Sequence, residues 1–71
     1  MKKKFVLCID NKGNESSLIA RKIYEIIPDP QAERDNFVRL VDESGEDYLH
    51  HMSHFVFVEL PEEVERILLA A

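Results

Sequence analysis

The chain has 71 residues, of which 45% are hydrophobic and 32% are charged, a balance typical of one folded domain rather than a disordered segment. Acidic side chains outnumber basic ones by 14 to 9, so the net charge is -5. Because an acidic body repels the phosphates of nucleic acids, we expect a single domain over residues 1–71 for which nucleic acid is an unfavourable partner.

The segment Phe5–Ile9 is predicted to form the first strand. It consists of apolar residues with high strand propensity on both alternating faces, which indicates a strand covered on both sides. The turn-forming residues 10–14 follow it. Although Lys2–Lys4 precede this apolar run, the run stops at Asp10, which is too short for a signal-peptide core or a membrane span.

Cys8 is the one cysteine of the sequence, so the chain has no internal disulfide. Small exported domains usually depend on several disulfides. We therefore expect a reducing, cytoplasmic setting, with Cys8 acting as an inert thiol inside the first strand.

The segment Ser16–Ile27 has two alternative interpretations. Its aliphatic residues fall on one helical stripe, and Ser16 or Ser17 is a suitable cap, so periodicity alone favours a helix. Alternatively, Lys22–Ile27 is a strand that follows an extended loop and is ended by Pro28. The residues themselves leave this choice open.

A short connector follows at residues 29–36. Asp29 is placed to cap a helix, Pro30 suits the first helical position because its missing N–H costs nothing there, and Asn36 is a typical stop. We predict a short connector helix from about Pro30 to Asp35.

A β-hairpin is predicted from Phe37–Val41 and Glu46–His50. If Gly45 adopts the left-handed conformation, the connection is a type I turn followed by a bulge. The acidic residues around this turn do not match a calcium-binding loop, and we predict that they form a solvated hairpin tip that discourages association at strand edges. These residues are Asp42, Glu43, Glu46 and Asp47.

After a break at residues 51–53, Phe55–Val58 is predicted to be the last strand. Pro61 then opens a final helix with acidic residues in its first turn, where they favour the helix dipole. Because a helix of this length does not persist alone in water, we expect it to dock on the sheet. The face expected to dock consists of Val64, Ile67, Leu68 and Ala71.

Several segments resemble a family of short stand-alone bacterial and phage proteins of uncharacterised function, which are expected to be small SH3-like barrels. The resemblance covers nearly the whole chain. It is carried by residues 8–11, 22–29, 41–49 and 55–60, of which the block Asp-Glu-Ser-Gly-Glu-Asp-Tyr-Leu at 42–49 is the most specific. The resemblance implies a strand at Lys22–Ile27 and a mainly β fold, an SH3-like barrel of four or five antiparallel strands with the connector helix and the carboxy-terminal helix. It implies no activity.

The sequence departs from that family at two places. Arg21 stands where the family is expected to have a glycine, and His50-His51 stands where an aromatic residue and a proline are expected.

The histidines His50, His51 and His54, with Cys8, are the one cluster of soft metal ligands. A structural zinc site normally takes about four convergent ligands and uses cysteines in close pairs, so metal binding at this turn is the alternative hypothesis rather than the favoured one. Ser53 lies next to His54 in sequence, but adjacency alone does not give a nucleophile and base their geometry. We expect no enzyme and no cofactor.

By elimination, the sequence predicts a non-catalytic interaction module whose partner is another protein. A weaker alternative is a nucleic-acid-associated regulator that uses Lys2–Lys4, Arg21 and Lys22. The residues predicted to contact a protein partner are Tyr24, Tyr48, His50, His54 and Phe55.

Overall fold

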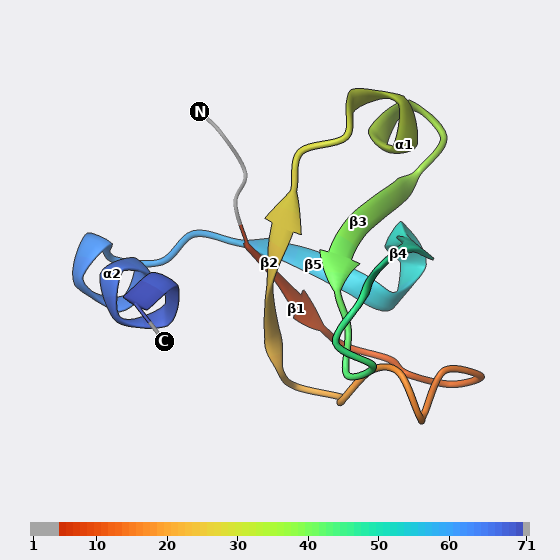
Figure 1. Ribbon diagram of the computed structural model, residues 1–71, viewed down its shortest axis with the longest axis horizontal. Helices are drawn as coiled ribbons and strands as arrows, with labels where there is room; N and C mark the ends of the chain where they lie inside the picture. The colour runs from red at the N-terminus through yellow and green to blue at the C-terminus, as the bar shows by residue number, and fades with distance from the viewer. Residues whose placement is uncertain (1–4, 71) are drawn as a thin grey trace.

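A computed structural model of the chain describes residues 5–70, which form five β-strands, two α-helices and a short 3-10 helix (Figure 1). The elements are β1 (Phe5–Cys8), β2 (Ile23–Ile27), α1 (Pro30–Arg34), β3 (Phe37–Val41), β4 (Asp47–His51), η1 (Met52–His54), β5 (Phe55–Val58) and α2 (Glu62–Ala70). Lys2–Lys4 and Ala71 lie outside the described residues.

The strands form one antiparallel sheet in the order β4-β3-β2-β1-β5. The predicted mainly β architecture is confirmed, with five strands, a connector helix and a carboxy-terminal helix. β4 and β5 are the two edges of the sheet, and closure into a barrel is not shown.

The segment before Pro28 is a strand, so the helix that periodicity favoured is wrong. β2 pairs with β1 on one side, with Tyr24 opposite Val6, and with β3 on the other, with Ile26 opposite Leu40. Both partners supply backbone hydrogen bonds to a β-branched segment that buries Tyr24 and Ile26 on one face, and this pairing outweighs the helical stripe.

The loop between β1 and β2 is anchored at its middle. The Leu18 side chain is fully buried, and its N–H donates to the carbonyl of Asn14 over 2.9 Å. At the end of the loop Arg21 has a φ of 71°, in the left-handed region that favours glycine. The family resemblance implies a glycine at this position, and the backbone conformation here is one that favours glycine.

The turns on either side of β3 have the predicted geometry. Asp29 caps α1, since its carboxylate accepts from the Ala32 N–H over 3.1 Å, and Asn36 follows the helix with a φ of 64°. At the hairpin tip the Gly45 N–H donates to the Asp42 carbonyl over 3.0 Å, and Gly45 has a φ of 87°. This turn over residues 42–45, with its left-handed glycine, agrees with the hairpin connection that the sequence predicts.

The core is one cluster of buried side chains around which the strands curl (Figure 1). The strands β1, β2, β3 and β5 contribute to it, and the loop before β2 contributes Leu18. Its members are Val6, Cys8, Leu18, Tyr24, Ile26, Val38, Leu40 and Phe55, with Met52 packed against it. From β4, the buried His50 contacts the Phe55 ring.

The helix α2 forms where Pro61 predicts it, but none of its residues is buried. Figure 1 shows α2 to one side of the strands, at the end of the linker that leaves β5. The helix was expected to dock on the sheet, but none of its side chains is buried there. β5 ends at Val58, and the linker that follows carries the helix beyond the strands. Ala71, the last residue of the expected docking face, lies outside the described residues.

Candidate functional site

Three of the five residues predicted to contact a partner lie in the core. Tyr24, His50 and Phe55 are 5%, 8% and 4% exposed, His54 is half-buried and Tyr48 is exposed. The Phe55 ring makes edge-to-face contacts with the rings of Tyr24, His50 and His54, at centroid distances of 6.5, 6.3 and 6.2 Å. The structure thus brings four of the five together, mainly as packing partners of Phe55.

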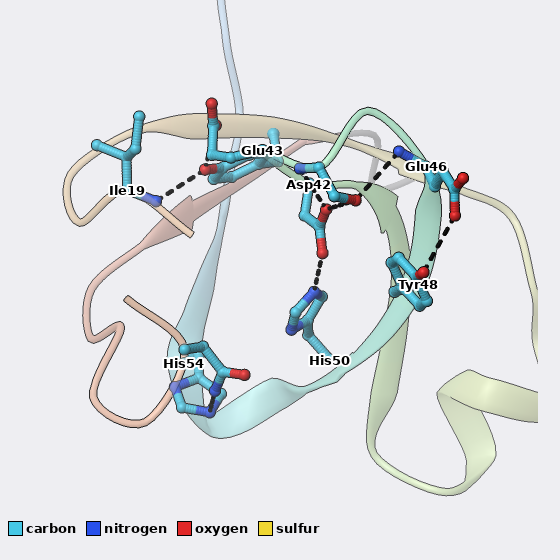
Figure 2. Close-up of polar contacts among 10 residues, drawn as sticks. Ile19, Asp42, Glu43, Glu46, Tyr48, His50 and His54 are labelled. Carbon is cyan, nitrogen blue, oxygen red and sulfur yellow. Dashed lines mark hydrogen bonds and ion pairs between the residues drawn. The ribbon is translucent and has the colours of Figure 1, made fainter. Parts of the chain in front are cut away.

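The hairpin carries a buried acid–imidazole pair, Asp42 and His50, which point toward one another in Figure 2. His50 Nε2 lies 3.0 Å from Asp42 Oδ2. The other carboxylate oxygen accepts the Ser44 backbone N–H over 2.9 Å and also the Ser44 hydroxyl. The solvated tip predicted from the acidic residues is therefore wrong for Asp42, which is 6% exposed.

Hydrogen bonding decides the charge state of Asp42. Burial acts to raise the pKa of this carboxyl, but the hydrogen bonds from Ser44 and His50 outweigh burial and lower the pKa below its usual value. Both Ser44 and His50 bind the carboxylate, and Ser44 Oγ donates to Asp42 rather than to the imidazole. The three residues therefore lack the serine-to-histidine hydrogen bond on which nucleophilic catalysis depends.

A second polar cluster ties the loop before β2 to the hairpin turn (Figure 2). Tyr24 Oη accepts the Ile19 N–H over 2.9 Å and donates to Glu43 over 2.7 Å, and Lys22 Nζ contacts the same carboxylate over 2.6 Å. The hydrogen bonds from Lys22 and Tyr24 lower the pKa of Glu43. Burial raises the pKa of Tyr24 to about 12, and Glu43 adds to the shift. Lys22 is therefore engaged in an ion pair, and Arg21 beside it is exposed.

His54 joins the start of the loop to β5. Its Nδ1 lies 2.8 Å from the carbonyl oxygen of Asp10, and because a carbonyl only accepts, Nδ1 carries the proton. Nε2 then accepts from the side-chain amide of Asn14 over 3.3 Å. His51 has different partners, since its Nδ1 accepts the Ser53 N–H over 3.1 Å and lies 2.9 Å from Ser53 Oγ. This contact caps η1.

The three histidines thus have three separate sets of partners. Within residues 5–70 no group of three or more His, Cys, Asp or Glu side chains is arranged to hold a metal ion. Cys8 is fully buried, and burial raises the pKa of its thiol, as the sequence predicts for an inert cysteine.

The most exposed apolar group at the carboxy-terminal end lies on α2, and it is named here the α2 apolar surface. Ile67 is 70% exposed, and the other members are 38% to 48% exposed. The surface consists of Val64, Ile67, Leu68 and Leu69. By their spacing, Val64, Ile67 and Leu68 share one helix face, and Leu69 lies on another. Acidic residues occupy the first turn of the same helix, and Arg66 lies within 3.9 Å of Glu62. Sequence reasoning identified three of these apolar residues but assigned them to a docked face, and it missed Leu69.

Comparisons of this chain with family models, with curated proteins and with solved structures find no significant match. Among residues 5–70 no helix has both the length and the apolar character needed to cross a bilayer. Function therefore has to be inferred from the geometry of the chain's own residues.

Proposed function

We propose that the protein is a small non-catalytic interaction module that binds another protein through the α2 apolar surface. The observation that carries this proposal is the exposure of four large aliphatic side chains on one short helix. Single exposed apolar residues are common on protein surfaces. Val64, Ile67 and Leu68 instead share one helix face, and such a group usually marks a place where another molecule binds.

The length of α2 supports the same conclusion. An isolated helix shorter than about 12 residues is marginal in water, and α2 has 9 residues, none of them buried. Its acidic first turn stabilises the helix only modestly. A partner that covers its aliphatic side chains supplies the packing that the rest of the described chain does not.

The scaffold that presents this helix is, in our proposal, an SH3-like barrel. Five short antiparallel strands curled around one core support it, together with the left-handed backbone at Arg21, where the family resemblance implies a glycine. Folds of this size host many unrelated functions, so the binding role depends on the α2 apolar surface and not on the fold.

The non-catalytic role is supported by how the polar side chains are used. Asp42, Glu43 and His54 each make two or more hydrogen bonds within the protein. Among residues 5–70 no buried side-chain nitrogen or oxygen lacks a hydrogen-bond partner. These groups stabilise the loop and the hairpin, and in our proposal they do no chemistry on a substrate.

Photo-crosslinking in cells that produce the protein tests this function. A photoreactive residue replaces Ile67 in one variant and, as a matched control, Ile19 in another, since Ile19 is also half exposed but lies in the loop before β2. We expect a discrete protein adduct from position 67 and none from position 19. No adduct at position 67, or the same adducts at both positions, contradicts the proposal.

A further inference from the structure

We propose that the free edge of β4 pairs with β4 of a second copy of this chain, which joins the two sheets in a weak, symmetric dimer. β4 is an edge strand that is hydrogen-bonded to β3 alone. The edge of a sheet presents backbone N–H and C=O groups with which another strand is able to pair. This inference goes beyond the α2 apolar surface, because Figure 1 shows α2 and β4 at opposite ends of the view.

Hydrogen bonds at the two ends of the β3–β4 hairpin show which β4 residues point outward. The Asp42 N–H donates to the Glu46 carbonyl over 3.2 Å, and the Met52 N–H donates to the Asn36 carbonyl over 2.8 Å. Bonded and non-bonded pairs alternate between these ends, so every second residue of β4 directs its backbone groups away from β3. These outward residues, all of them exposed, are Asp47, Leu49 and His51.

The other edge strand, β5, is less available. The Ile9 N–H donates to the His54 carbonyl over 2.9 Å, so by the same alternation the residues of β5 that point outward are Phe55 and Phe57. Phe55 is 4% exposed and its ring belongs to the core. β4 is therefore the edge at which a second strand has room to pair.

The residues of β4 are complementary to themselves when two copies run antiparallel. With Leu49 on the two-fold axis, Leu49 faces Leu49 of the other copy, and Asp47 faces His51 at both ends of the contact. An aliphatic pair then lies at the centre, with an acid beside an imidazole on either side. Cross-strand pairs of matched chemistry stabilise a sheet. This self-complementarity favours a second copy over an unrelated extended segment.

Asp47 and His51 have the atoms that their contact needs. Asp47 Oδ2 accepts from Arg39 over 2.9 Å, which leaves Oδ1 for a second donor. His51 Nδ1 accepts the Ser53 N–H over 3.1 Å, so the proton of the neutral ring lies on Nε2. Nε2 is thus a donor for Asp47 of the other copy.

The acidic turn of the hairpin favours the antiparallel direction. Glu43 and Glu46 lie in the turn, and Asp47 begins β4. A parallel pair places two such turns side by side, whereas an antiparallel pair places them at opposite ends. At about 3.4 Å per residue the two Asp47 are then roughly 14 Å apart, which exceeds the Debye length of about 8 Å at physiological salt. The turn therefore discourages parallel association and leaves the antiparallel edge open.

Sedimentation equilibrium on the purified chain measures the association. The contact is small, because one five-residue strand of each copy forms it. We therefore expect a dissociation constant on the order of 1 mM. Between about 0.05 and 2 mM, the average mass is expected to rise from 8.3 kDa toward twice that value. Added salt raises it further by screening the repulsion between two chains of charge -5. A monomer throughout this range overturns the proposal.

Two matched variants test which surface is used. Leu49→Lys places like charges opposite each other on the two-fold axis, and Val56→Lys makes the same change of charge on β5. The two side chains are 44% and 43% exposed, so neither variant is expected to unfold. We expect Leu49→Lys to abolish the rise in mass and Val56→Lys to keep it. Equal losses in the two variants reject the β4 edge as the interface.

Cysteine cross-linking tests the direction and the register. In the antiparallel pair the two Cα atoms of residue 49 lie roughly 5.5 Å apart, within the range that a disulfide spans. On oxidation with copper phenanthroline we expect Leu49→Cys to form a linked dimer and Glu46→Cys not to form one, because the two turns lie at opposite ends. Cys8 is fully buried and is not expected to react. Faster linkage through Glu46→Cys overturns the antiparallel arrangement.

Photo-crosslinking from position 49, in cells that overproduce the chain, distinguishes a second copy from another occupant of the edge. An adduct at about twice the chain mass supports the inference. Adducts with other proteins alone, or no adduct, overturn it. Either result leaves the binding role of the α2 apolar surface to its own test at position 67.

Discussion

At the scale of single residues, Asp42 and His50 are the buried polar side chains among residues 5–70. Each is tolerated inside the protein because it provides a hydrogen-bond partner for the other, and Ser44 donates hydrogen bonds to the remaining carboxylate oxygen. Removing one member leaves the other enclosed without its partner, which costs more free energy than the hydrogen bond itself contributes.

We expect Asp42→Ala to lower the free energy of unfolding by about 3 kcal/mol, because it leaves His50 buried and unpaired. Urea denaturation measures this change. Glu46→Ala is the matched control, since Glu46 is an exposed acidic residue of the same hairpin connection and its loss is expected to cost less than about 0.5 kcal/mol. Equal losses in the two variants contradict a structural role for the Asp42–His50 pair.

The burial of Tyr24 predicts a loss of stability at alkaline pH. Its pKa is about 12 in the folded chain, above its usual value of about 10, so the folded state keeps a proton that the unfolded state releases. The associated stability is complete below about pH 10 and falls by about 2 kcal/mol as pH rises toward 12. Urea denaturation at several alkaline pH values measures it.

Tyr24→Phe is expected to abolish this alkaline decline, although its stability at neutral pH is lower because Ile19 and Glu43 lose a hydrogen-bond partner. Tyr48→Phe is the control, because Tyr48 is 49% exposed and its replacement is expected to keep the decline. An unchanged pH profile in Tyr24→Phe shows that the decline has another source.

These residue-scale features were only partly predictable from sequence. The burial of Cys8 followed from its position inside an apolar strand, and the structure confirms that burial. The burial of Asp42 did not follow, because aspartate at the start of a turn is usually solvated. The register of β3 and β4 places its partner His50 beside it, and that register depends on the turn type. The turn residues alone did not show that the Asp42 side chain points inward toward His50.

At the scale of elements, β2 shows where local pattern and tertiary pairing disagree. Ile23 and Ile27 suit a helical stripe as well as they suit a strand, so periodicity could not decide between the two. The strand conformation is decided by pairing with β1 and β3, which lie far away in sequence. In contrast, the caps of α1 and the turn at Gly45 depend on neighbouring residues alone, and the structure confirms both.

The loop between β1 and β2 provides a prediction at this scale. Leu18 is fully buried, so Leu18→Ala is expected to lower the free energy of unfolding by about 3 kcal/mol through lost burial and the cavity left behind. Ile19→Ala is the control next to it, with an expected loss below about 1 kcal/mol, because Ile19 is 50% exposed. Urea denaturation distinguishes the two, and a smaller loss for Leu18→Ala than for Ile19→Ala contradicts the anchoring of the loop.

At the scale of the whole molecule, the sheet and α2 differ in how many buried side chains stabilise them. The core draws its side chains from the strands and from Leu18, whereas α2 contributes no buried residue. The sequence predicted the helix itself correctly, because Pro61 and the acidic first turn are local signals. Whether an apolar helical face is covered depends on where the linker directs the helix, and local signals carry no information on that direction.

We therefore expect a chain that ends after Pro61 to keep its fold. Because α2 adds no enclosed side chain, its removal is expected to lower the free energy of unfolding by less than about 1 kcal/mol. Leu40→Ala in the full-length chain is the contrasting variant, with an expected loss of about 3 kcal/mol from the centre of the core. Thermal and urea denaturation compare them, and unfolding of the shortened chain shows that α2 is part of the cooperative unit.

This separation affects how the sequence is able to change over evolutionary time. If α2 binds a partner as proposed, substitutions at Ile67, Leu68 or Leu69 alter that binding without weakening the cluster around Phe55. Substitutions in that cluster alter stability without changing the exposed side chains of α2. Selection for a new binding specificity therefore acts on residues that selection for folding leaves free to vary, so related chains are expected to diverge fastest after Pro61.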